Sequence, residues 1–508
     1  MPCIHDVIKD HISNKMIDID AFSEWIGLET LASQAALKER LSEWEKDPAK
    51  LQYLRAKFIA FKQAFKKDPK FFPECKAIFT EIAGIESKLT ELMNVDSSLE
   101  EETYSELLFM KSYLQPFNFV PFVLFLWSAL RIYIIPGLAL LIPLLIMFMP
   151  YIILTHLFHI PITFANYTQI LNCIIAGNID FLQTGLLEES GITLKQCGII
   201  AITLIQGVIQ PYWNYIHLQS VDTIIQEHGT LIARYKELYQ QLYDVLQAHR
   251  FTFFTSPLPN FTSVREAVAH VLLHKNSFKI ALRYIGSIEV LMTLAAKEEI
   301  QPVIWLSGKT PEFHGKDIFD FQVKTVVPIT VHLAEKRHAL LTGPNKGGKS
   351  TALRAITAAT LLAHTYGCAP GYVMLTPFHI MHVCLKPDDL PGSKSRFERE
   401  IEFTAHTLTE TGFTMVLIDE LYHSTNPPDA LRSCEIYCNQ LWKKQNMISV
   451  ISTHLFEFVE KTDEQIQHLC CPAKMVDGRV QFEYGLQEGI CRISSVDLLL
   501  EKNGLMRF

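Results

Sequence analysis

The stretch Leu340-Leu341-Thr342-Gly343-Pro344-Asn345-Lys346-Gly347-Gly348-Lys349-Ser350-Thr351 is typical of a loop that binds the phosphates of a nucleotide. Its glycines let the backbone turn successive N–H groups around a phosphate, and the helix expected from about Thr351 adds the positive end of its dipole. Lys349 is expected to reach the β- and γ-phosphates, and Ser350 to bind a phosphate-bound Mg²⁺. The apolar run Ala339-Leu340-Leu341 predicts the preceding strand. The sequence therefore predicts a site for ATP, or a close relative, with Mg²⁺.

Two further strand ends carry side chains that suit ATP hydrolysis. The apolar run Met415-Val416-Leu417-Ile418 ends in Asp419-Glu420, which assigns Asp419 to the metal and Glu420 to the general base. A third run, residues 447–452, leads to His454, which could polarise the γ-phosphate, although a lone histidine there is more often structural. We predict Lys349, Glu420 and His454 as catalytic residues. The predicted nucleotide-binding residues are Gly343, Pro344, Asn345, Lys346, Gly347, Gly348, Lys349, Ser350 and Thr351.

These motifs resemble those of the MutS family of DNA mismatch repair ATPases. The loop is similar to the family's Gly-Pro-Asn followed by Gly-Gly-Lys-Ser-Thr, and Ser452-Thr453-His454 is similar to its Ala-Thr-His switch. The further positions that carry the resemblance are Asp388-Asp389-Leu390, Ser395, Phe397, Glu400, Asp419-Glu420, Thr425, Asp429, Asp477-Gly478, Tyr484, Leu486 and Gly489.

The resemblance implies an α/β ABC-type P-loop ATPase domain over residues 285–508. In the family two such domains meet head to tail, so Ser395 and Asp429 would complete the partner's nucleotide site. A homodimer, or a heterodimer with a MutS relative, is implied. The sequence departs from the family at Lys346 and at Tyr422-His423-Ser424, where a Gly-Arg-Gly type turn is usual.

Residues 112–179 contain one ionised side chain, Arg131. Pro136-Gly137 divides the apolar run, so we predict helices over residues 118–135 and 138–158, forming a transmembrane hairpin within residues 116–162. The alternative is a helical hairpin buried in a soluble core. Residues 197–213 predict either a third span or a buried or interfacial helix.

The rest of the N-terminal part is predicted to be helical, with levers in regions 1–115 and 163–284. Apolar residues recur at helical spacing between Val221 and His249, and an equivalent region runs from Glu74 to Leu114. In the MutS family the DNA clamp lies at the tip of two lever helices. We therefore expect an integral membrane protein in which a hairpin replaces the clamp and both soluble parts face the cytoplasm.

Two functions follow, and they belong to different classes. The first is a membrane-anchored ATPase whose dimerising ATPase domains move the levers; the alternative is a DNA mismatch repair ATPase that binds mismatched DNA. Before residue 285 the chain leaves no room for separate mismatch-reading and connector domains together with the full lever and clamp, and the net charge of −8 gives no basic footprint for DNA. A lysine cluster could be a solvated helix face, a lipid contact or a DNA contact: Lys62, Lys66, Lys67, Lys70 and Lys76. Eleven cysteines without zinc-ligand spacing indicate structural thiols in a reducing compartment.

Overall fold

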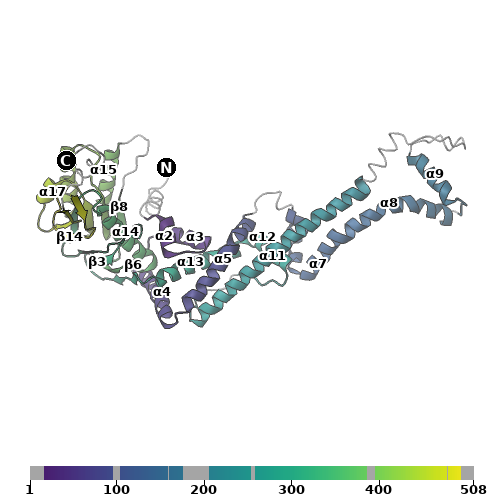
Figure 1. The fold of residues 1–508 in the computed structure, drawn as a ribbon, viewed down its shortest axis with the longest axis horizontal. Coiled ribbons are helices and arrows are strands. Elements are labelled where there is room, and N and C mark those ends of the chain that lie inside the picture. Colours follow the sequence, from purple (N-terminus) through teal and green to yellow (C-terminus); the bar gives the residue numbers. More distant parts are fainter. Residues whose placement is uncertain are drawn as a thin grey trace. The chain divides into compact units, whose positions relative to one another are not determined.

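The protein consists of a helical N-terminal region followed by an α/β region with a parallel sheet (Figure 1). The structure is a computed structural model that describes residues 17–94, 103–157, 159–175, 205–252, 258–385, 395–476 and 479–493. The chain forms two compact units. The first comprises residues 1–83, 245–252 and 282–508, and the second comprises residues 84–244 and 253–281.

A six-stranded sheet forms the centre of the α/β region, in the order β14-β11-β5-β10-β9-β8. The strands from β11 to β8 pair in parallel, and β14 pairs antiparallel with β11. β5, β9 and β10 are buried at every position, as expected for a parallel sheet covered on both faces. The carboxyl ends of these three strands therefore meet at one edge of the sheet. The bounds are β5 His338–Thr342, β8 Ile380–Cys384, β9 Thr414–Ile418, β10 Met447–Ser452, β11 Gln467–Cys470 and β14 Gln487–Glu488.

Smaller sheets flank this one. Four strands form the order β2-β7-β3-β4, and β1-β6 and β12-β13 form antiparallel pairs. Their bounds are β1 Ile300–Pro302, β2 Ile304–Trp305, β3 Phe313–Ile318, β4 Ile329–Leu333, β6 Cys368–Pro370, β7 Tyr372–Leu375, β12 Ala473–Val476 and β13 Arg479–Phe482.

Helix α14, which follows the phosphate loop, is buried along most of its length because N-terminal helices cover the side that does not face the strands. The Arg40 Nε donates to the Thr365 carbonyl (2.9 Å), and the Trp44 Nε1 donates to the Phe378 carbonyl (3.0 Å). The helices of this unit are α2 Ile19–Ile26, α3 Leu31–Leu41, α4 Pro48–Lys67, α14 Lys349–Tyr366, α15 Arg396–Thr407, α16 Pro427–Leu441 and α17 Phe456–Glu460. Three helices continue from one unit into the other, α5 Phe71–Met93, α11 Gln210–Ala248 and α13 Lys275–Ala296.

The described residues of the second unit form helices joined by turns, and none of them is in a strand. The predicted amphipathic helix between Val221 and His249 is confirmed as part of α11, which buries Tyr235, Leu238 and Leu242. The region from Glu74 to Leu114 is not one helix, because α5 ends at Met93, and residues 95–102 lie outside the described residues. The elements are η1 Gln115–Phe119, α7 Pro121–Ala129, η2 Leu130–Ile134, α8 Ile135–Ile152, η3 Ile153–Leu157, α9 Phe164–Ile175, η5 Ile205–Ile209, α11 Gln210–Ala248 and α12 Val264–Leu273.

The prediction of a transmembrane hairpin divided at Pro136-Gly137 is wrong. The helical path runs without interruption from Pro121 to Leu157, and by length and composition one stretch of the described residues, Pro121–Ile142, could cross a membrane. Proline 136 is accommodated because the turn before it, η2, is a π-helix, in which the Ile135 N–H donates to the Leu130 carbonyl. This wider turn relieves the clash between a proline ring and the preceding carbonyl, so the helix continues.

The predicted hydrophobic helix over residues 197–213 is only partly visible. Residues 197–204 lie outside the described residues, 205–209 form the π-helical turn η5, and 210–213 begin α11.

Candidate active site

The phosphate loop, residues 343–348, joins β5 to α14. Gly343 and Gly348 have φ angles of 148° and 106°, a region that favours glycine. A Cβ atom at Gly347 would lie 2.9 Å from the Pro344 carbonyl oxygen, so a larger residue would force the turn open. Lys346 is exposed and has a φ of 67°, which costs about 1 kcal/mol or more for a residue with a side chain. The loop is thus a tight turn of the kind that surrounds a phosphate.

Lys349 is the first residue of α14, and its side chain is buried under this turn. Its Nζ donates to the carbonyl oxygens of Gly343 (2.9 Å) and Pro344 (3.2 Å). Burial lowers the pKa of the ammonium, and the nearby carboxylates of Glu420 and Asp419 oppose that shift. A buried ammonium held by neutral carbonyl oxygens would gain from a charged acceptor, so the loop fits a phosphate.

Asp419 follows β9 and lies between the loop and the neighbouring strand. Its Oδ2 accepts from the Ser350 hydroxyl and its Oδ1 from the Ser452 hydroxyl, each at 2.5 Å. The predicted Mg²⁺ ligands Ser350 and Asp419 are therefore adjacent, and oxygen ligands of this kind suit a hard cation. The contact from Ser452 was not predicted, because the sequence does not state which strands are neighbours.

Glu420 and His454 come together at the ends of β9 and β10. The His454 Nε2 lies 3.4 Å from the Glu420 Oε1, and the Glu420 backbone N–H donates to the Ser452 hydroxyl (2.8 Å). Glu420 has a φ of 55°, which turns its side chain out of the strand direction. Burial and the charge of Lys349 lower the pKa of His454, so this imidazole is neutral at neutral pH. A carboxylate next to a neutral imidazole can accept a proton from water.

A cleft of about 580 Å³ opens beside the loop. Glu420, Lys349 and Ser350 line one side of it, and the segment 323–327 between β3 and β4 lines another. Tyr484 also lines the cleft and lies beside Gly348. The cleft has the size expected for a small-molecule site.

The sequence does not predict that the segment 323–327 lines the cleft, because the segment carries no motif. Asp320, which precedes this segment, is held to α14 by a partly buried ion pair in which the Arg354 Nε donates to the Asp320 Oδ2 (2.7 Å). The Arg354 guanidinium also reaches the Thr351 hydroxyl (3.2 Å). In the sequence, Asp320 and Arg354 are 34 residues apart, and only the folded structure shows that they form an ion pair next to this segment.

Ser395 and Asp429 do not line this cleft. Both are exposed at helix starts: Ser395 caps α15 by accepting from the Glu398 N–H (3.2 Å), and Asp429 lies in the first turn of α16. Such positions leave both side chains accessible to a second chain.

The remaining positions of the resemblance have mixed outcomes. Asp388-Asp389-Leu390 and Asp477-Gly478 lie outside the described residues. Glu400 is buried in α15, and burial raises the pKa of its carboxyl group. Tyr422, where the sequence departs from the family, is buried and its hydroxyl lies 2.6 Å from the Thr404 hydroxyl. The unusual residue therefore has a packing role.

Residues 339–498 match the family model of MutS domain V. The match begins in β5, one residue after its start, and includes the phosphate loop, Asp419-Glu420 and His454. MutS domain V is the ATPase domain of that family, so this part of the chain is an ATPase domain that uses ATP with Mg²⁺.

Proposed function

We propose that this chain, which carries an ATPase domain of the MutS family, is a membrane-anchored ATPase whose helical levers respond to ATP. The observation that supports an anchor is the apolar helical stretch Pro121–Ile142, which is only 17% buried. A helix of this composition in a soluble core would be mostly buried, since contiguous apolar surface in water is costly.

The exposed apolar side chains continue along α8 and η3. Among the described side chains of these two elements, most are apolar and exposed or half-buried. On an insertion scale each apolar residue near the bilayer centre contributes about −0.3 to −0.6 kcal/mol, whereas a central lysine costs about 2.5 to 3.5 kcal/mol. The exposed apolar side chains include Leu138, Leu141, Ile142, Leu145, Phe148, Met149, Ile152 and Leu157.

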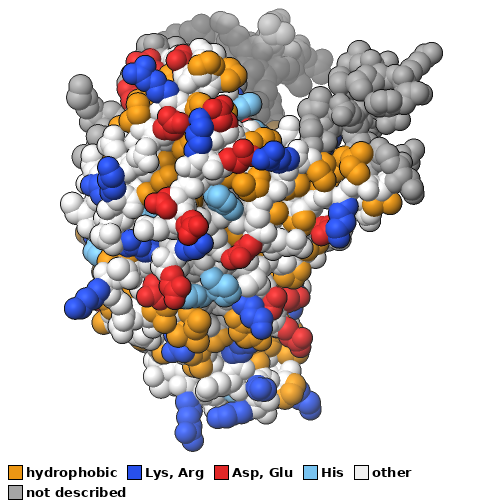
Figure 2. Space-filling model, turned by 90° about the vertical axis from the view of Figure 1, so that its left-hand side faces the viewer, with side chains coloured by type: hydrophobic (Ala, Val, Ile, Leu, Met, Phe, Trp, Pro, Cys, Tyr) orange, Lys and Arg blue, Asp and Glu red, His pale blue; other side chains and the backbone are white. Residues whose placement is uncertain are grey.

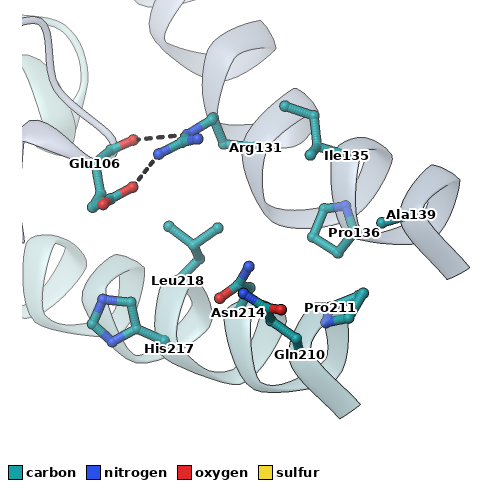
Figure 3. A pocket seen from close by; sticks show the side chains of 10 residues that line it. All are labelled: Glu106, Arg131, Ile135, Pro136, Ala139, Gln210, Pro211, Asn214, His217 and Leu218. Atoms are coloured by element: carbon teal, nitrogen blue, oxygen red, sulfur yellow. Dashed lines mark hydrogen bonds and ion pairs between the residues drawn. The ribbon is translucent and has the colours of Figure 1, made fainter. Parts of the chain in front are cut away.

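Arg131 lies within the stretch Pro121–Ile142, and its guanidinium pairs with the Glu106 carboxylate (Figure 3), so we place the start of the membrane segment at this residue. Next to this pair, a cavity of about 400 Å³ separates the helix containing Pro136 and Ala139 from α11, which contributes Gln210 and Asn214 (Figure 3). Beyond this polar boundary, α8 has 18 residues and η3 five. Together they rise about 34 Å, close to the roughly 30 Å of a bilayer core.

Within the second unit, the chain before the apolar helix lies against the chain that follows it. The Tyr104 hydroxyl lies 3.0 Å from the His228 Nδ1, and the Phe119 ring lies 4.6 Å from the His270 ring. Chain that precedes the apolar helix thus contacts chain that follows it. We place the ATPase domain on the cytoplasmic side, where it meets ATP.

In the proposed reaction, Lys349 and the N–H groups of the loop hold the β- and γ-phosphates, and Ser350 and Asp419 hold Mg²⁺. The bound ion would supply positive charge to the phosphate oxygens. Glu420 accepts a proton from the attacking water, whose oxygen forms the new bond to the γ-phosphorus while the bond to the β-phosphate oxygen breaks. The products are ADP and phosphate.

The membrane anchor is tested by alkaline carbonate extraction of membranes from cells that express the full chain. We expect the wild-type chain in the pellet. A variant with Leu138→Lys, Leu141→Lys and Leu145→Lys should move to the supernatant, because these side chains are exposed and their change affects insertion more than folding. The control is Ile436→Lys, an equally apolar exposed position on α16. Release of the wild type, or retention of the triple variant, would contradict the anchor.

The DNA-binding alternative has less support. Of the lysine cluster, the Lys62 Nζ donates to the carbonyl of Lys297 (3.2 Å), and the Lys76 Nζ lies 3.3 Å from the Glu29 Oε1. In Figure 2, acidic and basic side chains are mixed over the upper and middle parts of the face, whereas Lys and Arg side chains gather at its lower end. Binding of DNA by the wild-type chain that weakens steeply with salt would nevertheless favour this alternative.

A further inference from the structure

A second cluster of polar side chains lies in the ATPase domain and takes no part in the site described above. It consists of His382 in β8, His406 in the last turn of α15, and Glu410 in the connection from α15 to β9. One nitrogen or oxygen atom of each residue lies within 4.8 Å of the others. β8 is the edge strand of the six-stranded sheet.

We propose that His382, His406 and Glu410 bind one divalent transition-metal ion of the zinc class. Two imidazoles and one carboxylate are ligands that Zn²⁺ prefers, and with a water molecule they complete a tetrahedral set. Bonds of about 2.0 to 2.2 Å require ligand atoms roughly 3.3 Å apart. The His382 Nε2 and the Glu410 Oε1 already lie 3.1 Å apart, so only a small movement of His406 closes the site.

The three side chains differ in exposure in a way that suits a metal site with one open position. His382 is buried against the Phe403 and His406 rings, whose centroids lie 6.1 and 5.5 Å away. Glu410 is half-buried and His406 is exposed. The ion could therefore enter from solvent, and water could occupy the fourth position.

The backbone near Glu410 is held in place independently of any ion. The Asn446 Nδ2 donates to the carbonyls of Glu410 (3.2 Å) and Gly412 (2.8 Å), and the Thr414 N–H donates to the Asn446 carbonyl (2.9 Å). A preorganised ligand loses less conformational entropy on binding. An ion here would fasten the C-terminal end of α15 to the sheet edge, and the N-terminal end of the same helix is capped by Ser395, the predicted partner-site residue.

The alternative is a hydrogen bond between His382 and Glu410 without a metal, and Glu410→Gln separates the two. The glutamine oxygen can still accept from the imidazole, but it is a far weaker metal ligand than a carboxylate. His406→Ala removes an exposed ligand and should leave the fold intact. His379→Ala is the matched control, because His379 is exposed, precedes β8 and is outside the cluster.

The experiment is titration of the purified full chain with Zn²⁺ after chelator treatment, followed by calorimetry and by visible absorption of bound Co²⁺. We expect the wild type and His379→Ala to bind one ion per chain. Glu410→Gln and His406→Ala should each bind Zn²⁺ at least tenfold more weakly. In the absence of metal, the melting temperature of these variants should equal that of the wild type. The free cysteines are present in every variant, so any Zn²⁺ that they bind contributes equally to each titration. Equal Zn²⁺ affinity of wild type and His406→Ala, or a Co²⁺ spectrum that is not tetrahedral, would overturn the proposal.

Discussion

The sharpest chemical prediction concerns Glu420, the carboxylate placed beside a neutral His454. Glu420→Gln keeps the size of the side chain but cannot accept a proton. The rate of phosphate release should fall by about 10²- to 10⁴-fold, while nucleotide binding persists. Lys349→Ala should instead lose nucleotide binding, because it removes the buried ammonium of the loop. Both are measured by phosphate release and by binding of a fluorescent ATP analogue.

Glu457→Gln is the control for that experiment, since Glu457 is exposed on α17 and pairs with Lys461. Its turnover should equal that of the wild type. If Glu420→Gln hydrolyses ATP at the wild-type rate, Glu420 is not the general base.

A second residue-scale prediction concerns His364, which is buried in α14. The His364 Nδ1 donates to the Glu45 carbonyl (2.7 Å), and the Phe378 N–H donates to the His364 Nε2 (3.3 Å). Burial lowers the pKa of this imidazole to about 4. Its native state is neutral, so its contribution to stability is complete above pH 6.5 and is lost as the pH falls toward 4, by about 1.4 kcal/mol per pH unit.

His364→Gln removes this titration. The variant should be less stable at pH 7 but should lose less of its remaining stability between pH 7 and pH 5 than the wild type does. Urea unfolding at both values measures this, with the exposed His379→Gln as control. Parallel losses in wild type and His364→Gln would contradict the assignment.

Among residues, those of the nucleotide site could be predicted because each belongs to a local motif. The structure brings Lys349, Ser350, Asp419, Glu420 and His454 together at one sheet edge, as their order along the chain predicts. The segment 323–327 could not be predicted because it carries no motif. The proposed metal cluster could not be predicted because His382 meets His406 and Glu410, which are four residues apart, only in the folded structure.

At the scale of elements, the close approach of α13 to α3 gives a matched pair of glycine substitutions. A Cβ at Gly286 of α13 would lie 2.3 Å from the Ala32 carbonyl oxygen, whereas a Cβ at Gly84 of α5 would meet nothing within 4 Å. Gly286→Ala must therefore separate two helices and should destabilise by a few kcal/mol. Gly84→Ala should stabilise by about 0.5 to 1 kcal/mol, because alanine favours a helix interior.

Thermal unfolding of the two variants measures these opposite signs. A stable Gly286→Ala variant would mean that α13 and α3 can separate without loss of packing. Both glycines lie within helices, so the gain in helix propensity is similar for the two variants. The difference between their stability changes therefore reports the contact between α13 and α3.

The wrong prediction from the sequence, a helix end at Pro136-Gly137, also concerns an element. Pro136-Gly137 predicts a helix end because proline lacks an N–H donor and its ring clashes with the carbonyl of the preceding turn. The π-helical turn at residues 130–134 removes that clash by adding one residue to the turn. The spacing of apolar residues does not predict a π-helical turn. The apolar composition therefore correctly predicts a helix, whereas Pro136-Gly137 wrongly predicts where that helix ends.

For the whole molecule, the prediction to test is the partner-completed nucleotide site, since ATPase domains of the MutS family typically dimerise. Lys349 lies in the chain's own cleft, while Ser395 is exposed outside it. If Ser395 serves the partner's nucleotide, Lys349→Ala and Ser395→Ala should each be inactive alone. In a mixed dimer of the two variants, one site carries both changes and the other carries neither.

Mixing the two inactive chains should therefore restore about one quarter of the wild-type rate, because half of the dimers are mixed and each has one intact site. Ser395 also caps α15, so a merely unfolded Ser395→Ala chain must be considered. Such a chain could not restore activity to its partner, and recovery on mixing thus distinguishes a lost contact from a lost fold. A mixture as inactive as its components, with both chains shown to be folded and dimeric, would place Ser395 outside the partner's site.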